Sequence, residues 1–155
     1  MAEISIFDVC VSFKEHPWYV NLTLFVDGCP RACKGCSWKG VKKDVHKFNE
    51  DSFTQLLSNY QNKVENVVFL GGDWLGKNLL PFIDIAHLFG FSACLYSGAD
   101  AVSEIDEDVL KNLEWLKVGS WKEEFGPLTS PTTNQRFYKL SSGKVVDEIK
   151  FYEGE

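Results

Sequence analysis

The feature that most restricts the fold of this 155-residue chain is an alternation of strand-like and helix-like segments between residues 18 and 121. β-branched or continuous apolar runs predict strands at residues 18–26, 64–73, 91–98 and 115–121. Helical spacing of apolar residues and helix-end signals predict helices at residues 49–62, 76–90 and 106–114. Alternation of this kind builds a parallel sheet whose strands are joined by right-handed crossovers.

The two ends of the chain add further β-structure. Residues 3–13 are predicted to form a strand, and RFYKL with KVVDEIKFY predicts a hairpin around the SSG turn at 141–143. A full eight-unit βα barrel needs about 250 residues, so the chain is too short for one. The sequence therefore predicts a single α/β domain over residues 1–155. We expect a partial βα barrel or an open curved sheet, mostly parallel, that ends in a C-terminal hairpin.

Charge and composition restrict the class of protein. The net charge of −6 argues against a general nucleic-acid binder, because such a protein needs a basic face for phosphates. The basic stretch KGVKKDVHK at 39–47 is interpreted as a solvated loop. No apolar run reaches the roughly 18 residues of a membrane span, and the N-terminus lacks the features of a signal peptide. We therefore expect a cytoplasmic protein with no nucleic-acid or membrane partner.

Three of the five cysteines stand close together in FVDGCPRACKGCSW, residues 25–38. Cys29, Cys33 and Cys36 form a CxxxCxxC group, and clustered thiolates are soft ligands for zinc or iron–sulfur centres. A structural zinc site usually has four ligands, and the chain contains no second compact pair. A four-iron cluster held by three thiolates instead leaves one iron open for a substrate, as catalytic metal sites do.

A second motif, LGGD at residues 70–73, is expected at the carboxyl end of a strand. In parallel α/β sheets, ligands bind at this end of the strands. The adjacent Gly71 and Gly72 allow the backbone to press against a ligand, and Asp73 can pair with a cationic amine. The alternative is a plain strand-to-helix turn in which Asp73 caps the following helix.

The order of these two motifs resembles the radical S-adenosylmethionine (SAM) superfamily. That superfamily has CxxxCxxC after one strand and a GG-acid motif after the next. A narrower resemblance is to the activating proteins of anaerobic ribonucleoside-triphosphate reductases. It is carried by FGPLTSPTTNQRFYKL at 125–140, together with CKGC, LYSG at 95–98 and LKVGSW at 116–121. These segments span residues 22 to 140, which is most of the chain.

The resemblance implies a partial barrel of the radical SAM type, a 4Fe-4S cluster and SAM as cofactors. SAM would chelate the open iron, and one electron would cleave it to methionine and a 5′-deoxyadenosyl radical. The cofactors carry this chemistry while the protein positions them. In this family the radical removes hydrogen from a glycine near the C-terminus of an anaerobic (class III) ribonucleotide reductase. The implied partners are the reductase and a low-potential electron donor such as a flavodoxin or ferredoxin.

The resemblance also implies roles for individual residues. The cluster ligands would be Cys29, Cys33 and Cys36. The SAM amino group would be held by Gly71, Gly72 and Asp73. The adenine would lie against Gly35 and Ser37, and Ser97 would contact the SAM carboxylate or ribose, unless it only forms a turn. The partner would be bound by Thr132, Thr133, Asn134, Gln135 and Arg136, with a simple polar loop as the alternative.

The sequence departs from the family pattern at a few positions and leaves other functions open. Asp73 stands where much of the superfamily has glutamate, and Ser37 follows the third cysteine in place of an aromatic residue or histidine. One alternative is an activase of another glycyl-radical enzyme. Another is a small iron–sulfur electron carrier with Cys10 or Cys94 as fourth ligand, although both are expected to be core cysteines. A structural zinc module, with His46 as a weak candidate ligand, is the third.

Overall fold

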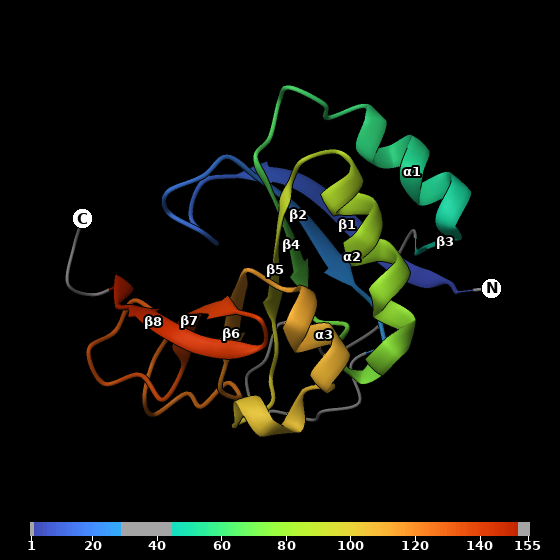
Figure 1. The fold of residues 1–155 in the computed structure, drawn as a ribbon. Helices are drawn as coiled ribbons and strands as arrows, with labels where there is room; N and C mark the ends of the chain where they lie inside the picture. Colours follow the sequence, from blue (N-terminus) through green and yellow to red (C-terminus); the bar gives the residue numbers. More distant parts are fainter. Residues whose placement is uncertain (1, 29–44, 152–155) are drawn as a thin grey trace.

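A computed structural model of the chain describes residues 2–28 and 45–151 (Figure 1). The strands in this part are β1 Ile4–Ser12, β2 Asn21–Val26, β3 His46–Phe48, β4 Asn66–Leu70, β5 Ser92–Tyr96, β6 Trp115–Val118, β7 Arg136–Ser141 and β8 Lys144–Ile149. The α-helices are α1 Glu50–Ser58, α2 Leu80–Leu88 and α3 Glu107–Asn112. Two 3-10 helices, η1 Asp73–Leu79 and η2 Val102–Glu104, complete the described elements.

The described strands form one eight-stranded sheet in the order β3-β1-β2-β4-β5-β6-β7-β8. The pairings β2–β4, β4–β5 and β5–β6 are parallel, and the other four pairings are antiparallel. The predicted α/β fold and the C-terminal hairpin β7–β8 are confirmed. The sheet is partly parallel rather than mostly parallel, because antiparallel strands flank the parallel centre on both sides. The strand pairings do not show a barrel.

Several predicted boundaries need correction. β2 begins at Asn21 and not at residue 18, and residues 46–48 form the short strand β3 in a segment expected to be irregular. The predicted helix at 76–90 is the end of η1 followed by α2, and Gly76, inside η1, has non-helical backbone angles (φ 56°, ψ −131°). Pro81 lies in the first turn of α2, the place in a helix where proline is tolerated. The helix start predicted at residue 49 is confirmed, and Asn49 caps α1 through a capping box with Ser52.

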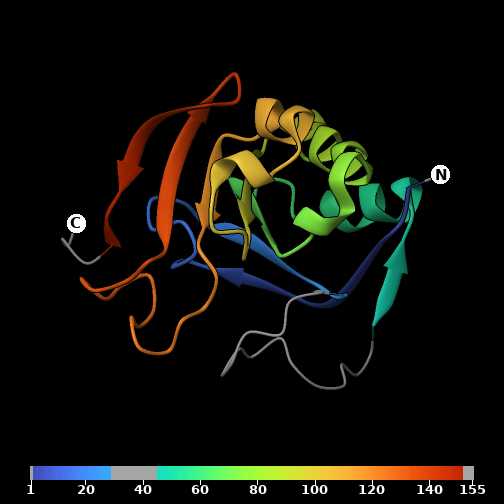
Figure 2. The same ribbon diagram turned by 90° about the horizontal axis from the view of Figure 1, so that it is seen from below.

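The three α-helices lie on one face of the sheet (Figures 1 and 2). Alternate strand residues such as Leu24, Phe69 and Leu95 point into this helix-covered core and are fully buried. Phe53 of α1 and Phe82 of α2 pack there with ring centroids 5.0 Å apart. Burial of this apolar surface is the main favourable term in folding, and it fixes which residues of each strand face the opposite side.

The opposite face of the sheet, called the helix-free face below, has its own smaller core. Val68, Leu70, Cys94, Trp115 and Phe137 are buried there. At the amino ends of the strands a polar ladder crosses this face, since Asn66 donates to Asn21 Oδ1 (2.9 Å) and accepts from Ser92 Oγ (2.6 Å). Buried amides need such partners, so the ladder favours one strand register.

The loop between β1 and β2 closes the same end of the helix-free face. His16 of this loop is 0% exposed and its ring packs on Trp115, with the centroids 4.1 Å apart. His16 Nδ1 accepts from Trp18 N, and its buried Nε2 has no hydrogen-bond partner. Burial lowers the pKa of His16 from 6.5 to about 4. The folded protein therefore holds His16 in its neutral form.

Folding stability is expected to fall as the pH drops from 6.5 toward 4. In that interval the unfolded chain binds a proton at His16 and the folded chain does not, so the folded state loses up to about 3 kcal/mol. The variant His16→Phe should lose this part of the pH dependence. Urea unfolding of both proteins across the interval measures the difference, with the exposed residue His46 replaced by Phe as control. Equal pH slopes for wild type and His16→Phe would contradict the assignment.

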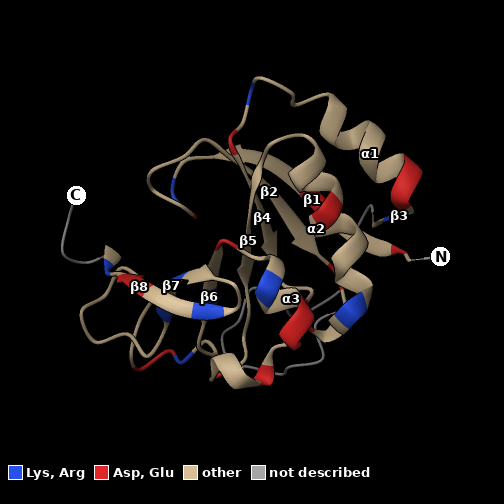
Figure 3. Ribbon diagram, viewed as in Figure 1, with Lys and Arg blue, Asp and Glu red and all other residues tan. Residues whose placement is uncertain are grey.

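Charged residues are distributed over the described elements without segregation by sign. Figure 3 shows Lys and Arg positions interspersed with Asp and Glu positions along the ribbon. The ion pairs of Lys77 Nζ with Asp106 (3.1 Å) and Asp108 (2.8 Å) tie η1 to the start of α3. In the described part of the chain, no helix is both long enough and apolar enough to span a bilayer.

Candidate functional site

The parallel strands β2, β4, β5 and β6 all end at the same edge of the sheet, called the carboxyl edge below. Phe25 of β2 pairs with Leu70 of β4, and Leu70 pairs with Tyr96 of β5. Gly28 is the second residue after the end of β2, and Cys29 follows it directly in the sequence. Cys29, Cys33, Cys36, Gly35 and Ser37 lie outside the described residues, so their predicted roles stay predictions.

The Gly71–Asp73 turn lies at this edge, directly after β4, as the sequence predicted. Gly71 and Gly72 have φ values of 87° and 105°, a region that favours glycine. Gly71 N donates to Tyr96 O (2.9 Å), which fixes the turn against the end of β5. Asp73 is the first residue of η1 and is half-buried. The turn therefore combines a ligand-compatible backbone with a carboxylate at the expected place.

The stretch that leads into the cysteine motif lies close to the stretch that follows Asp73. A Cβ atom built on Gly28 would lie 3.5 Å from Trp74 Nε1. Gly28 and Trp74 are 46 residues apart in the chain, but both lie just beyond the ends of neighbouring parallel strands. The fold thus brings Gly28, the residue directly before the CxxxCxxC motif, close to Trp74, the residue directly after the GGD turn.

Ser97, a predicted SAM contact, takes part in a turn after β5. Its Oγ accepts from Ala99 N (2.9 Å), and the residue is 1% exposed. Its backbone N donates to Lys117 O (2.8 Å), so it links β5 to the end of β6. The turn-forming role is therefore observed, and a contact with SAM stays a prediction.

The segment at 132–136, predicted to bind a partner, folds back on its own chain. Thr132 Oγ1 donates to Phe125 O (2.7 Å), and Asn134 Nδ2 donates to Ser120 O (3.0 Å). Arg136 Nη1 donates to Thr133 O (2.9 Å) and Gln135 O (3.1 Å). Thr133 Oγ1 accepts from Gln135 N (3.0 Å). These polar side chains therefore shape the loop, and their predicted role in partner binding is not tested by the fold.

The loop approaches the end of β6 at Gly119. Gly119 has φ +112°, and a Cβ atom built there would lie 2.7 Å from Gln135 Cα and 3.1 Å from Asn134 O. A side chain at this position would collide with backbone atoms, which can give way only if the loop at 132–136 shifts. Gly119 is therefore required for a close chain crossing.

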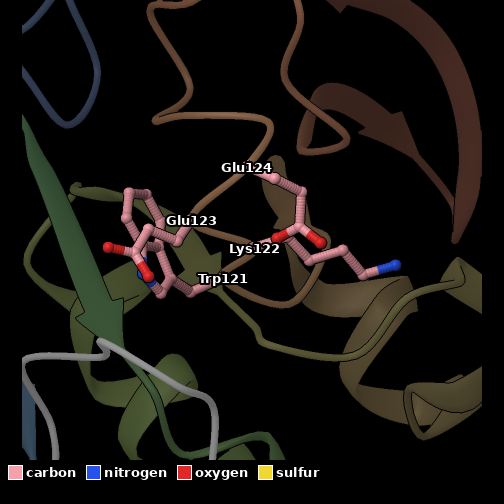
Figure 4. A pocket seen from close by; sticks show the side chains of 4 residues that line it. All are labelled: Trp121, Lys122, Glu123 and Glu124. Carbon is pink, nitrogen blue, oxygen red and sulfur yellow. The ribbon is translucent and has the colours of Figure 1, made fainter.

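A surface hollow of about 620 Å³ lies just beyond this crossing, lined by the consecutive residues Trp121, Lys122, Glu123 and Glu124. Figure 4 shows Trp121 and Glu123 together on one side, with Lys122 and Glu124 on the other. Trp121 Nε1 is buried and has no hydrogen-bond partner. All its lining residues come from one largely exposed segment, so the hollow is open to solvent rather than enclosed.

The two described cysteines are poorly suited to be metal ligands. Cys94 is 0% exposed on the helix-free face, and burial raises the pKa of its thiol well above the usual value. Cys10 is half-buried, and burial with the nearby Glu15 and Asp8 carboxylates raises the pKa of its thiol as well. A metal binds the thiolate form, which a raised pKa disfavours. Cys94 is a core cysteine as predicted, whereas Cys10 is only half-buried.

Among residues 2–28 and 45–151, no group of three or more His, Cys, Asp or Glu residues could hold a metal ion. His46, the weak zinc candidate, is exposed in β3.

A comparison with protein-family models matches residues 20–112 to the 4Fe-4S single cluster domain. The chain belongs to the 4Fe-4S single cluster domain family. The matched range extends from just before β2 to the end of α3, so it includes all three motif cysteines and the GGD turn.

The 4Fe-4S single cluster domain is the radical SAM-type domain common to glycyl-radical activases. Family membership therefore confirms the predicted iron–sulfur class and is typical of radical SAM enzymes. It does not distinguish one activase from another. No curated protein and no solved structure matches the chain.

The burial of two polar residues of the helix-free face, His16 and Lys117, was not predicted from the sequence. His16 gave no signal, because a single histidine in a loop has no pattern that predicts burial. Lys117 interrupts the apolar run of β6, and it is 7% exposed. A lysine inside an otherwise apolar strand was the available signal, since lysine is rarely buried without a specific partner.

Proposed function

We propose that this chain is a radical SAM activase that installs a glycyl radical on an anaerobic ribonucleoside-triphosphate reductase. The observation that carries the proposal is the close approach of Gly28 to Trp74 at the carboxyl edge. Gly28 directly precedes the cysteine motif, and Trp74 directly follows the GGD turn. Membership of the 4Fe-4S single cluster domain family supports the same chemistry.

The chain has a donor set that fits a 4Fe-4S cluster. Cys29, Cys33 and Cys36 would hold three irons as thiolates. Cys94 is not a suitable fourth ligand, because its thiol is buried with a raised pKa. One iron is then left for SAM. When bound, the cluster would supply the electron for reductive cleavage of SAM, and the resulting radical chemistry would remove a hydrogen atom from the glycine of the reductase.

The chain's own contribution to this reaction is binding and orientation. Asp73 is half-buried at the turn and would accept hydrogen bonds from the SAM amino group, while Gly71 and Gly72 allow close approach of the backbone. Gly35 and Ser37 would contact the adenine. This geometry would hold SAM over the carboxyl edge, where ligands of parallel sheets bind.

For the protein partner, we propose contact through the loop that follows β6. Thr132 and the residues lining the hollow from Lys122 to Glu124 are exposed. The internal hydrogen bonds of Asn134 and Arg136 would keep this surface in one conformation, which reduces the entropy lost on binding. A flavodoxin or ferredoxin is the proposed electron donor.

The proposed function predicts two products. Protein reconstituted with iron and sulfide under anaerobic conditions should convert SAM and a strong reductant to 5′-deoxyadenosine, measured by chromatography. Addition of an anaerobic ribonucleotide reductase should then give a glycyl-radical signal in electron paramagnetic resonance, and a reductase whose target glycine is replaced by alanine is the control.

The two readouts separate the parts of the proposal. An intact cluster that undergoes reduction but forms no 5′-deoxyadenosine would exclude radical SAM chemistry and favour a small electron carrier. Formation of 5′-deoxyadenosine with a radical only on a different glycyl-radical enzyme would contradict the proposed partner.

A further inference from the structure

The loop between β1 and β2, residues 13–20, covers the amino end of the helix-free face and is called the strap below. His16 is its only buried residue, and the others are half-buried or exposed. The His16 ring packs against Trp115 of β6, with the centroids 4.1 Å apart, and against Phe137 of β7, with the centroids 5.3 Å apart. The packing of the strap on the sheet therefore depends mainly on one histidine.

The hydrogen bonding of His16 requires the neutral imidazole. Its Nδ1 accepts from Trp18 N (3.3 Å), and its buried Nε2 has no partner in the described part of the chain. Only an unprotonated ring nitrogen can accept a hydrogen bond. Protonation of Nδ1 would set a second N–H against the N–H of Trp18 and would bury a positive charge, which is costly without a compensating acceptor. Protonation of His16 therefore opposes the packing of the strap.

Burial, and not a neighbouring charge, sets the proton affinity of His16. The titratable groups on the strap and on the neighbouring strands of the same face are Lys14, Glu15, Tyr19, Cys94, Tyr96, Lys117 and Lys139. Burial is what lowers the pKa of His16 to about 4, with no contribution from these side chains. A proton that enters at His16 is therefore not stabilised by an acidic partner in the attached strap.

The strap is held at a second point, Glu15. Tyr96 Oη donates a hydrogen bond to Glu15 O, and Thr23 Oγ1 donates to Glu15 Oε1 (3.4 Å). The backbone O of the same Tyr96 accepts from Gly71 N (2.9 Å). Tyr96 thus links the strap to the Gly71–Asp73 turn through a single residue.

The rest of the fold does not depend on the strap. β1 and β2 pair with each other from Ile6 opposite Val26 to Ser12 opposite Asn21, and this pairing ends before the strap begins. In the described part of the chain, all buried residues of the helix-covered core lie outside residues 13–20. The strap can therefore leave the sheet as a local opening while the strands and helices stay in place.

We propose that the strap is a proton-sensitive switch: protonation of His16 detaches residues 13–20 from the helix-free face while the sheet and the helix-covered core stay folded. Detachment exposes the rings of Trp115 and Phe137 and removes the acceptor of the Tyr96 hydroxyl. The switch needs neither an iron–sulfur cluster nor SAM, so it is independent of the proposed function.

Hydrogen exchange of the full-length, cluster-loaded protein under anaerobic conditions tests the switch. The amides of Trp18 and Tyr19 report on the strap, because they donate to His16 Nδ1 (3.3 Å) and His16 O (3.2 Å). Exchange is followed by mass spectrometry in peptides that cover the strap and β4, at pH 7.5 and pH 5.5. Rates are corrected for the intrinsic pH dependence of amide exchange.

In wild type, the protection of the strap amides should fall about tenfold from pH 7.5 to pH 5.5. The detached His16 has the ordinary pKa of 6.5, whereas the attached residue has a pKa of about 4, so acid favours detachment. The amides of β4 should stay more protected than those of the strap at both pH values. His16→Phe should remove the pH dependence, and His46→Phe, at an exposed histidine, should retain it.

Two further variants complete the test. His16→Gln can still accept from Trp18 N but does not titrate, so it should also lack the pH dependence, and it serves if His16→Phe does not fold. Tyr96→Phe should lower strap protection about fivefold at both pH values, the usual effect of losing one neutral hydrogen bond. Unchanged protection in Tyr96→Phe would contradict the attachment at Glu15.

Three results would overturn the switch. Equal pH dependence in wild type and in the His16 variants would assign the effect to another group. Equal protection of the strap and β4 at pH 5.5 would show that the strap leaves the sheet only when the whole protein unfolds. Absence of pH dependence in wild type would show that the surrounding rings stabilise the protonated imidazole enough to keep the strap attached.

Discussion

Replacement of Cys33 by alanine is expected to abolish the iron–sulfur cluster, and with it the formation of 5′-deoxyadenosine. Three thiolates hold the cluster in the proposed function, and two ligands would leave a second iron without a protein anchor. Iron and sulfide analysis of anaerobically reconstituted protein measures the loss directly. Cys29→Ala and Cys36→Ala should give the same result, whereas the SAM-binding residues should be dispensable for cluster assembly.

Cys94→Ala and Cys10→Ala are the controls for this experiment. Cys94 is fully buried in β5 and Cys10 is half-buried in β1, and both have thiol pKa values raised by burial. Neither thiol is therefore expected to ligate iron, and both variants should retain a full cluster. A cluster lost in either variant would contradict the open-iron proposal, because it would indicate a fourth protein ligand as in an electron carrier.

Replacement of Gly119 by alanine is expected to lower the free energy of unfolding by about 2–5 kcal/mol, the sum of backbone strain and overpacking. A Cβ atom there would lie 2.7 Å from Gln135 Cα, and φ is +112°. The obstructing atoms are backbone, so relief requires the loop at 132–136 to move away from β6.

Gly90→Ala separates strain from collision. Gly90 also has a positive φ (+81°), but a Cβ atom there would have nothing within 4 Å. This variant should therefore lose only about 1–2 kcal/mol, the usual cost of a left-handed conformation for a residue with a side chain. Urea unfolding measures both variants. Equal destabilisation would show that the close crossing at Gly119 adds nothing beyond its backbone angle.

Much of the central fold could be predicted from the sequence, because its signals are local. The buried strands β4 and β5 are short apolar runs, and α1 begins at a capping box. The edge strand β3 could not be predicted in this way. It has three residues, two of them exposed, and its pairing depends on β1, about forty positions earlier in the chain. Its formation is decided by that distant partner and not by its own residues.

The sequence by itself determined the chemistry of the candidate site: the spacing of three soft ligands and a GG-acid turn at the end of a strand. These are properties of contiguous residues, so local order is enough to express them. Only the tertiary structure decided how other residues are used. It buried His16 under aromatic rings, buried Lys117 near the end of β6, and turned the side chains of Asn134 and Gln135 onto the end of β6. The physical reason is that burial and charge environment depend on strands that are distant in the chain and neighbours in the sheet.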